Sequence, residues 1–166
     1  MQKSLLITII VVAGLTTLLG CASSSNTEAG ANVKAYTTNL GTATLYDINQ
    51  KTSLILDRYQ FQIIRFESST DMTYYETEWK SRYPFEDEID QGVQQARTRI
   101  IIQATPRARG ALGADLSTVR LQVENQVRYR DGVEWHYAAV AGMLKSYIKE
   151  LIDNLTTEFR TGIRKF

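Results

Sequence analysis

Residues 119–130, with the sequence VRLQVENQVRYR, alternate between apolar and polar side chains along their whole length. In an extended strand, successive side chains point to opposite faces of the sheet. One face is apolar except for Asn125, and its members are Val119, Leu121, Val123, Val127 and Tyr129. The other face carries Arg120, Gln122, Glu124, Gln126, Arg128 and Arg130. One buried and one solvated face are typical of an antiparallel sheet and argue against a parallel one.

Three earlier segments also have the composition of strands. Residues 60–67 are rich in Phe and Ile, residues 73–80 alternate, and residues 97–105 carry consecutive isoleucines at their centre. Residues 43–46 fit a short additional strand at the edge. In the 73–80 segment, alternation predicts one face with Tyr75, Thr77 and Trp79. It predicts an opposite face with Tyr74, Glu76, Glu78 and Lys80.

Two helices are predicted to flank these strands. Asp47 can cap a helix over residues 47–58, with Gln50 as its capping-box partner. A longer helix is predicted over residues 136–160, because apolar side chains recur there at helical spacing. That apolar stripe consists of Leu144, Tyr147, Ile148, Leu151, Leu155 and Phe159.

The order of these elements predicts an α+β fold. A four-stranded antiparallel meander, or a five-stranded one with the edge strand, would pack its apolar face on the N-terminal helix and the long C-terminal helix. Residues 41–166 have the length of a single domain. A domain of this size buries roughly two-thirds of its unfolded surface and needs no disulfide.

The first twenty residues have the features of an export signal. Lys3 provides a positive charge, and an uncharged apolar run from Leu5 to Leu19 follows it. That run is shorter than the roughly 20 residues that cross a bilayer as a helix, and it suits a signal peptide. Leu18-Leu19-Gly20-Cys21 resembles the lipobox of bacterial lipoproteins. The resemblance implies cleavage between Gly20 and Cys21, and lipid on Cys21. The alternative is an uncleaved anchor helix with an incidental cysteine.

The segment that follows Cys21 is predicted to be a tether. Residues 21–40 begin with small and polar residues that cannot bury enough apolar surface to order themselves. The residue after the cysteine is Ala22 rather than Asp. By the sorting rule of enteric bacterial lipoproteins, this implies the outer membrane, with the domain facing the periplasm.

The element order of the domain suggests a second resemblance. A helix, four strands and a long helix, together with Tyr75-Glu-Thr-Glu-Trp79, are similar to the helix-grip domains of the outer-membrane assembly lipoprotein BamC. The resemblance implies an envelope accessory that binds protein partners. It assigns no functional residue to this chain.

Charge and motif content exclude several classes of function. The chain has 19 Lys and Arg against 18 Asp and Glu, whereas nucleic-acid binding is associated with a basic field. The single histidine, His136, is predicted to pack at the start of the last helix, and too few ligands accompany it for zinc. Gly110 and Gly113 lack the Lys-Ser or Lys-Thr that follows in a phosphate-binding loop. We therefore expect no catalytic residue, no metal and no cofactor.

Acidic residues gather in the polar segment 82–95. They are Glu86, Asp87, Glu88 and Asp90, and they lack the spacing of a calcium-binding loop. A solvated acidic loop is the favoured interpretation, and a loose calcium site is the alternative.

The polar sheet face is the predicted interaction site. Its candidate residues are Tyr74, Glu76, Arg120, Arg128 and Arg130, because mixed charge with Tyr and Arg suits a protein interface. An ordinary solvated face with cross-strand ion pairs is the favoured interpretation of these residues, and the interface is the alternative.

These features favour a membrane-anchored binding or scaffold lipoprotein that acts in outer-membrane or cell-envelope assembly. One alternative is a module that binds a small ligand or a lipid in a cavity lined by Trp79, Tyr75 and Leu151. The least favoured is a cell-wall hydrolase, which would need acids gathered near His136.

Overall fold

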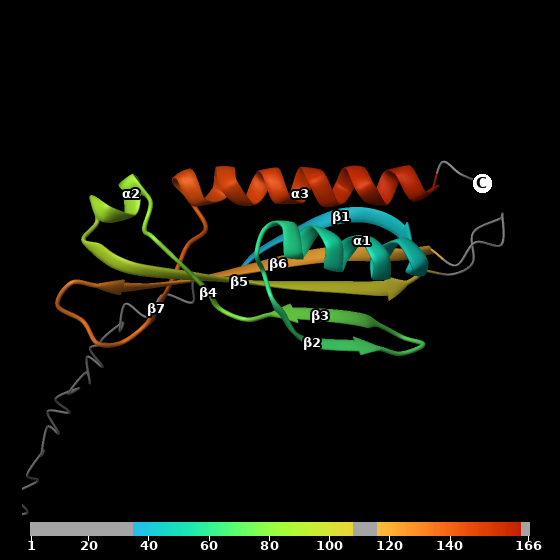
Figure 1. Ribbon diagram of the computed structural model, residues 1–166, viewed down its shortest axis with the longest axis horizontal. Coiled ribbons are helices and arrows are strands. Elements are labelled where there is room, and N and C mark those ends of the chain that lie inside the picture. Colours follow the sequence, from blue (N-terminus) through green and yellow to red (C-terminus); the bar gives the residue numbers. More distant parts are fainter. Residues whose placement is uncertain (1–34, 108–115, 164–166) are drawn as a thin grey trace, which may run out of the picture. The chain divides into compact units, whose positions relative to one another are not determined.

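The computed structural model describes residues 35–107 and 116–163, with side chains as far as Thr161. The predicted signal peptide, the lipobox, most of the tether and the glycines of the 107–117 loop lie outside the described residues. The predicted α+β fold is confirmed: an antiparallel sheet packs with an N-terminal helix and a long C-terminal helix (Figure 1). In chain order the elements are β1 (Tyr36–Thr44), α1 (Leu45–Arg58), β2 (Ile63–Ser68), β3 (Thr73–Thr77), β4 (Lys80–Arg82), α2 (Glu86–Ile89), β5 (Val93–Pro106), β6 (Leu116–Tyr129), β7 (His136–Ala138) and α3 (Gly142–Ile163).

All strand pairs in the sheet are antiparallel, in the order β1-β6-β5-β3-β2. The predicted meander corresponds to β2, β3, β5 and β6, while β4 pairs with β5 and β7 with β6. The edge strand β1 is longer than predicted. It begins at Tyr36, so the end of the predicted tether, residues 21–40, is strand, and the domain starts before residue 41.

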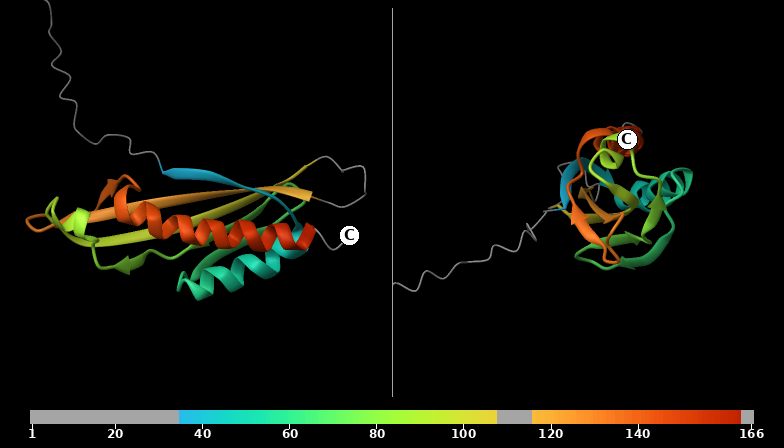
Figure 2. Two further views of the ribbon diagram at one scale, coloured as in Figure 1. Left: turned by 90° about the horizontal axis from the view of Figure 1, so that it is seen from above. Right: turned by 90° about the vertical axis from the view of Figure 1, so that its left-hand side faces the viewer.

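The hydrophobic core lies between one face of the sheet and the two longer helices. Helices α1 and α3 contact each other on the same side of the sheet, and α3 runs along the strands (Figure 2). The alternation of β6 is confirmed for Val119, Leu121 and Val123, which are buried in this core, and Val127 is buried in a smaller cluster. The prediction is wrong for Tyr129, which is exposed at the end of the strand. The largest fully buried side chains include Ile48, Ile55, Leu56, Ile100, Ile102, Leu121, Leu144, Ile148, Leu151, Leu155 and Phe159.

Helix α1 is capped by Thr44 and not by Asp47 as predicted. The Thr44 hydroxyl accepts a hydrogen bond from the Asp47 backbone N–H at 3.1 Å and donates one to Asp47 Oδ2 at 2.5 Å. Thr44 ends β1 with an extended backbone, and that conformation suits an N-cap residue. The helix therefore starts two residues earlier than predicted, and Asp47 lies in its first turn.

The last helix begins at Gly142, six residues later than the predicted start at 136. Residues 136–138 form β7 beside β6, so His136 lies in a strand, exposed, with its ring near that of Tyr129. The helix start is set by Asp87, whose Oδ2 accepts a hydrogen bond from the Met143 backbone N–H at 3.1 Å. Gly142 has a φ of +50° there, and a Cβ on it would lie 1.7 Å from the Asp87 carboxylate.

The prediction of a solvated acidic loop at residues 86–90 is wrong for Glu88, because this side chain is buried in an ion pair. Both Glu88 oxygens accept hydrogen bonds from the Arg82 guanidinium, each at 2.6 Å. Arg82 also donates to Asn125 Oδ1 at 3.0 Å and to Thr98 Oγ1 at 3.2 Å. The pair thus explains why a polar residue, Asn125, interrupts the apolar face of β6. Glu86 and Asp90 are exposed, as predicted.

The pKa of Glu88 makes the stability of the fold depend on pH. Burial works against the charged carboxylate, but the hydrogen bonds from Arg82 and from the Phe85 backbone N–H outweigh it. They lower the pKa of Glu88 below its ordinary value of 4.5. A carboxyl with a lowered folded-state pKa stabilises the fold above its unfolded pKa, and the contribution is lost as pH falls through the folded value.

The Glu88→Gln variant should reveal this dependence. At pH 7 we expect the variant to unfold at lower urea concentration than the wild type, because Gln cannot pair with Arg82 as an anion. The difference in urea midpoint between wild type and variant should narrow below about pH 4.5, as Glu88 itself becomes protonated. Urea titrations from pH 7 to pH 3 measure it, and a gap that stays constant over this range would contradict the assignment.

Candidate functional site

The sheet face opposite α1 and α3, called the outer face below, is polar and half-exposed. It follows directly from the alternation of β3, β5 and β6. The face presents Tyr74, Glu76, Arg97, Arg99, Ile101, Gln103, Arg120, Gln122, Glu124, Gln126 and Arg128. Its arginines outnumber its glutamates, and aromatic rings from Trp79, Trp135 and Tyr137 lie against it.

Arginine and tryptophan side chains alternate across this face. The Arg97 guanidinium lies 4.9 Å from the ring centroid of Trp79 and 4.2 Å from that of Trp135. Arg99 lies 4.8 Å from Trp79, and Arg128 lies 5.4 Å from Trp135. Each such contact contributes about 0.5–2 kcal/mol, depending on how dry it is. We call these five residues the arginine–tryptophan ladder.

Trp79 reaches the outer face because the strand alternation reverses between β3 and β4. Glu76 pairs with Ile101, and Lys80 pairs with Thr98. The chain between Glu76 and Lys80 therefore has one residue more than the stretch of β5 that lies opposite it. An extra residue of this kind is a bulge, and it turns the following side chains over. The prediction that Trp79 shares a face with Tyr75 is therefore wrong. Lys80 points to the helix side instead, where its Nζ donates to the Tyr59 carbonyl at 2.7 Å.

A network of ion pairs fixes the charges beside the ladder. Arg99 bridges two carboxylates, with Nη1 2.5 Å from Glu76 Oε1 and Nη2 2.6 Å from Glu124 Oε2. The Tyr74 hydroxyl donates to Glu76 at 3.0 Å, and Gln122 donates to Glu124 at 3.0 Å. Burial and the Glu76 carboxylate raise the pKa of Tyr74, so its hydroxyl stays a hydrogen-bond donor. The polar groups of this face are thus held in place before any partner arrives.

The structure unites some of the predicted interface residues and separates others. Tyr74 and Glu76 belong to the Arg99 network, and Arg128 belongs to the ladder. Arg120 is exposed on the same face, where it is the cross-strand partner of Gln103 in β5. Arg130 lies apart from them, because it follows the end of β6. It lines a surface hollow together with Ile89, Asp90, Gly92, Tyr129, Asp131 and Gly132.

Sequence reasoning missed the centre of the site. Arg97, Arg99 and Trp135 were not among the predicted interface residues, although they make most of the ladder contacts. The signal for the arginines was present, because Arg97 and Arg99 alternate with the buried Thr98 and Ile100. Trp135 precedes β7, and only the turn after β6 brings it back over the sheet.

The residues named for the alternative functions are not brought together. Tyr75 and Leu151 are buried in the core, whereas Trp79 lies on the outer face, so the three line no common cavity. Burial raises the pKa of Tyr75 to about 12. Among residues 35–107 and 116–163, no three His, Cys, Asp or Glu side chains are placed to hold a metal ion. No helix within these ranges has the length and apolar character needed to cross a membrane.

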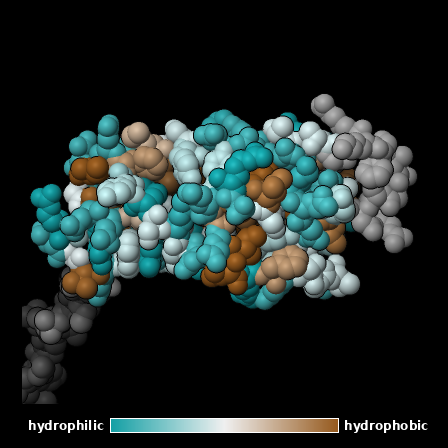
Figure 3. Space-filling model, in the orientation of Figure 1, coloured by the Kyte–Doolittle hydropathy of each residue, from teal (hydrophilic) through white to brown (hydrophobic). Residues whose placement is uncertain are grey.

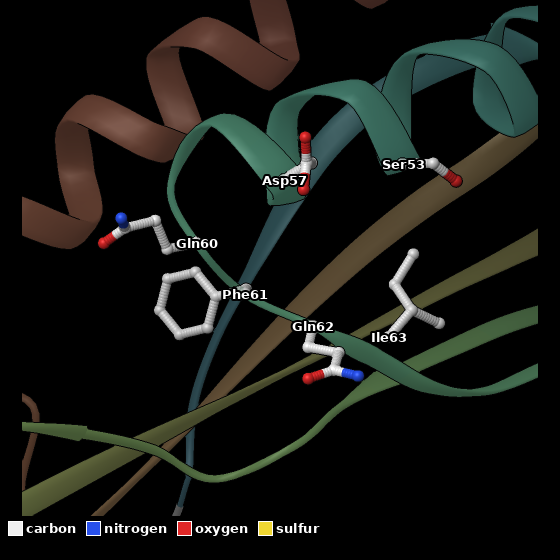
Figure 4. Close-up of a pocket in the computed structure, with 6 residues that line it drawn as sticks. All are labelled: Ser53, Asp57, Gln60, Phe61, Gln62 and Ile63. Atoms are coloured by element: carbon white, nitrogen blue, oxygen red, sulfur yellow. The ribbon is translucent and has the colours of Figure 1, made fainter.

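A separate hollow of about 560 Å³ lies where α1 ends and β2 begins (Figure 4). It is lined by Ser53, Asp57, Gln60, Phe61, Gln62 and Ile63. Asp57 and Ser53 project from the helix, and Gln62 and Ile63 come from the strand side (Figure 4). The hollow is shallow and lies away from the arginine–tryptophan ladder.

No protein-family model matches this chain, and no curated protein matches it in sequence. Function is therefore inferred from the outer face and from the N-terminal sequence.

Proposed function

We propose that this protein is a lipid-anchored lipoprotein of the cell envelope and that its outer face binds a protein partner. In this proposal the domain serves as a binding or scaffold accessory in outer-membrane or envelope assembly. The observation that carries the proposal is the arginine–tryptophan ladder, held on a rigid sheet and flanked by fixed carboxylates.

The chemistry of the outer face favours a protein over other partners. Trp, Tyr and Arg are the residues most enriched at binding hot spots, and all three gather here. Glu76 and Glu124 lie within the arginine cluster, which disfavours a polyanion such as nucleic acid. Because the Arg99 network already orders these side chains, little conformational entropy is lost when a partner binds them.

Lipid on Cys21 would hold this face near a membrane, with the tether setting its reach. The support is the lipobox-like sequence at residues 18–21 and the small, polar residues after it. Two or three acyl chains give stable anchoring, whereas one gives marginal binding. Ala22 after the cysteine favours the outer membrane, on its periplasmic side.

Replacing Cys21 with Ser should release the protein from the membrane while the domain stays folded. We expect the wild type in the membrane fraction, with an acylated N-terminus at residue 21, and the variant in the soluble fraction. Fractionation, intact mass and circular dichroism measure these outcomes. If the wild type carries no acyl chain and keeps its first twenty residues, the anchor is an uncleaved helix and not a lipid.

Crosslinking in intact cells tests the binding role itself. We expect the wild-type protein to give an adduct with a defined second protein, identified by mass spectrometry. Capture of the monomer alone, under conditions that crosslink a known envelope complex, would contradict the proposal.

A further inference from the structure

Strand β2 forms an edge of the sheet that the described residues leave uncovered. It pairs with β3 and with no other strand in the part of the chain that the structure describes. Its side chains are exposed from Ile64 to Ser68, including Ile64 at 59% and Phe66 at 52%. Figure 1 shows β2 at the lower edge of the sheet, and Figure 3 shows hydrophobic surface over α1 and the β2–β3 hairpin. An edge with exposed apolar residues is a template for pairing with another strand.

We propose that β2 pairs antiparallel with β2 of a second copy of this chain, around a twofold axis at Phe66. A twofold contact is isologous, so the same strand must complement itself. In this register Phe66 lies opposite the second copy's Phe66. Arg65 then lies opposite the second copy's Glu67, and Glu67 opposite the second copy's Arg65. The strand is thus complementary in charge to its own reverse.

The neighbouring registers are disfavoured by the same charges. An axis at Arg65 would place the two Arg65 side chains opposite each other, and an axis at Glu67 would oppose two carboxylates. A shift by one residue would place the apolar side of one β2 strand next to the charged side of the other. A parallel, in-register pair would again align like charges. The Arg-Phe-Glu sequence of residues 65–67 therefore favours the register centred on Phe66, the only one of these that opposes Arg65 and Glu67.

The contacts within one copy place these side chains correctly for such a pair. Arg65 and Glu67 project together to the outer face, where Arg65 Nη2 lies 2.7 Å from Glu67 Oε1. Arg65 also lies over the Tyr74 ring, with 5.0 Å to its centroid. Phe66 projects to the helix side, where it packs on Tyr75 with 4.9 Å between ring centroids. Pairing would cover the exposed part of both Phe66 rings and join two outer faces into one continuous surface.

The pairing should be weak in solution, because only a short stretch is available. The register between β2 and β3 is regular from Arg65 to Ser68, and a bulge interrupts it between Ile63 and Arg65. Few backbone hydrogen bonds can therefore form at the edge. If the proposed anchor confines the chain to a membrane surface, its local concentration there favours the pair. The dimer thus extends the proposed function, while its own test needs no lipid.

Sedimentation of charge variants tests the register directly. The full chain carrying Cys21→Ser is used throughout, so that lipid does not interfere. We expect a monomer–dimer equilibrium that moves with concentration. Arg65→Glu and Glu67→Arg, each alone, should weaken self-association at least about tenfold, because both place like charges opposite each other. An equimolar mixture of these two variants should restore the dimer, since one chain then carries two acids and the other two arginines.

Two controls complete the experiment. The double swap Arg65→Glu with Glu67→Arg should dimerise like the parent, and Arg107→Glu, an exposed charge reversal away from β2, should leave dimerisation unchanged. Circular dichroism checks that each variant is folded. A monomer at every concentration up to roughly 1 mM, or a mixture no better than either variant alone, would overturn the dimer. Neither result would contradict the proposed binding of a protein partner, because the crosslinking experiment above reports on the outer face of each copy.

Discussion

Replacing Arg82 with Met is expected to lower the free energy of unfolding by about 3–5 kcal/mol. The change removes the cation from a pair whose side chains are only 11% and 12% exposed. Glu88 would keep its charge in a buried site or take up a proton, and both are costly. Asn125 and Thr98 would lose a donor at the same time. Urea denaturation followed by tryptophan fluorescence measures the loss.

Two further variants separate the buried charge from the loss of packing. The double change Arg82→Met with Glu88→Leu should recover much of the stability, because an apolar pair of similar size leaves no buried charge. Lys149→Met breaks an exposed pair with Asp153 and should leave the unfolding curve unchanged. An Arg82→Met protein within 1 kcal/mol of the wild type, roughly the value of an exposed pair, would show that the Glu88 site is wet and weakly coupled.

Replacing Trp135 with Ala is expected to weaken partner binding at least about 30-fold, the effect of a hot-spot residue. Trp135 lies between Arg97 and Arg128, so its removal takes an aromatic contact from two guanidinium groups at once. It lies outside the two hydrophobic clusters of the core, and the domain should therefore stay folded. The measurement is the amount of partner that co-purifies from native membranes, followed by titration once the partner is identified.

Tyr83→Ala is the matched control for the ladder. It also replaces an aromatic residue by Ala, but Tyr83 is 94% exposed and makes no ladder contact. Its variant should co-purify with the partner as the wild type does. If Trp135→Ala and Tyr83→Ala retain the partner equally, the ladder is a structural cover of the sheet and not its binding surface.

Sequence patterns predicted the parts of this fold that depend on periodicity. The alternation of residues 119–130 placed the buried face of β6 correctly as far as Val127, although Tyr129 is exposed and Gln126 is buried. The apolar stripe of residues 144–159 identified the buried side of α3. These patterns suffice because burial acts on every second residue of a strand, or on every third or fourth residue of a helix.

The errors occurred where contacts between distant residues override the local pattern. The capping prediction favoured Asp47, but the end of β1 supplied Thr44 as the cap. The start of α3 depends on Asp87, a residue far away in the sequence. The bulge after Thr77 turned Trp79 to the outer face, and no local signal marked it. The arginine–tryptophan ladder depends on that bulge, so its centre could not be predicted from alternation alone.

The claim that the outer face binds a protein partner is tested most directly by site-specific photocrosslinking in intact cells. One variant carries the photoreactive residue at Gln103, half-exposed on the outer face, and another carries it at Thr157, exposed on α3. We predict an adduct with the same second protein from position 103 and none from position 157. An adduct from position 157 with none from position 103 would contradict the claim and assign binding to the helix side.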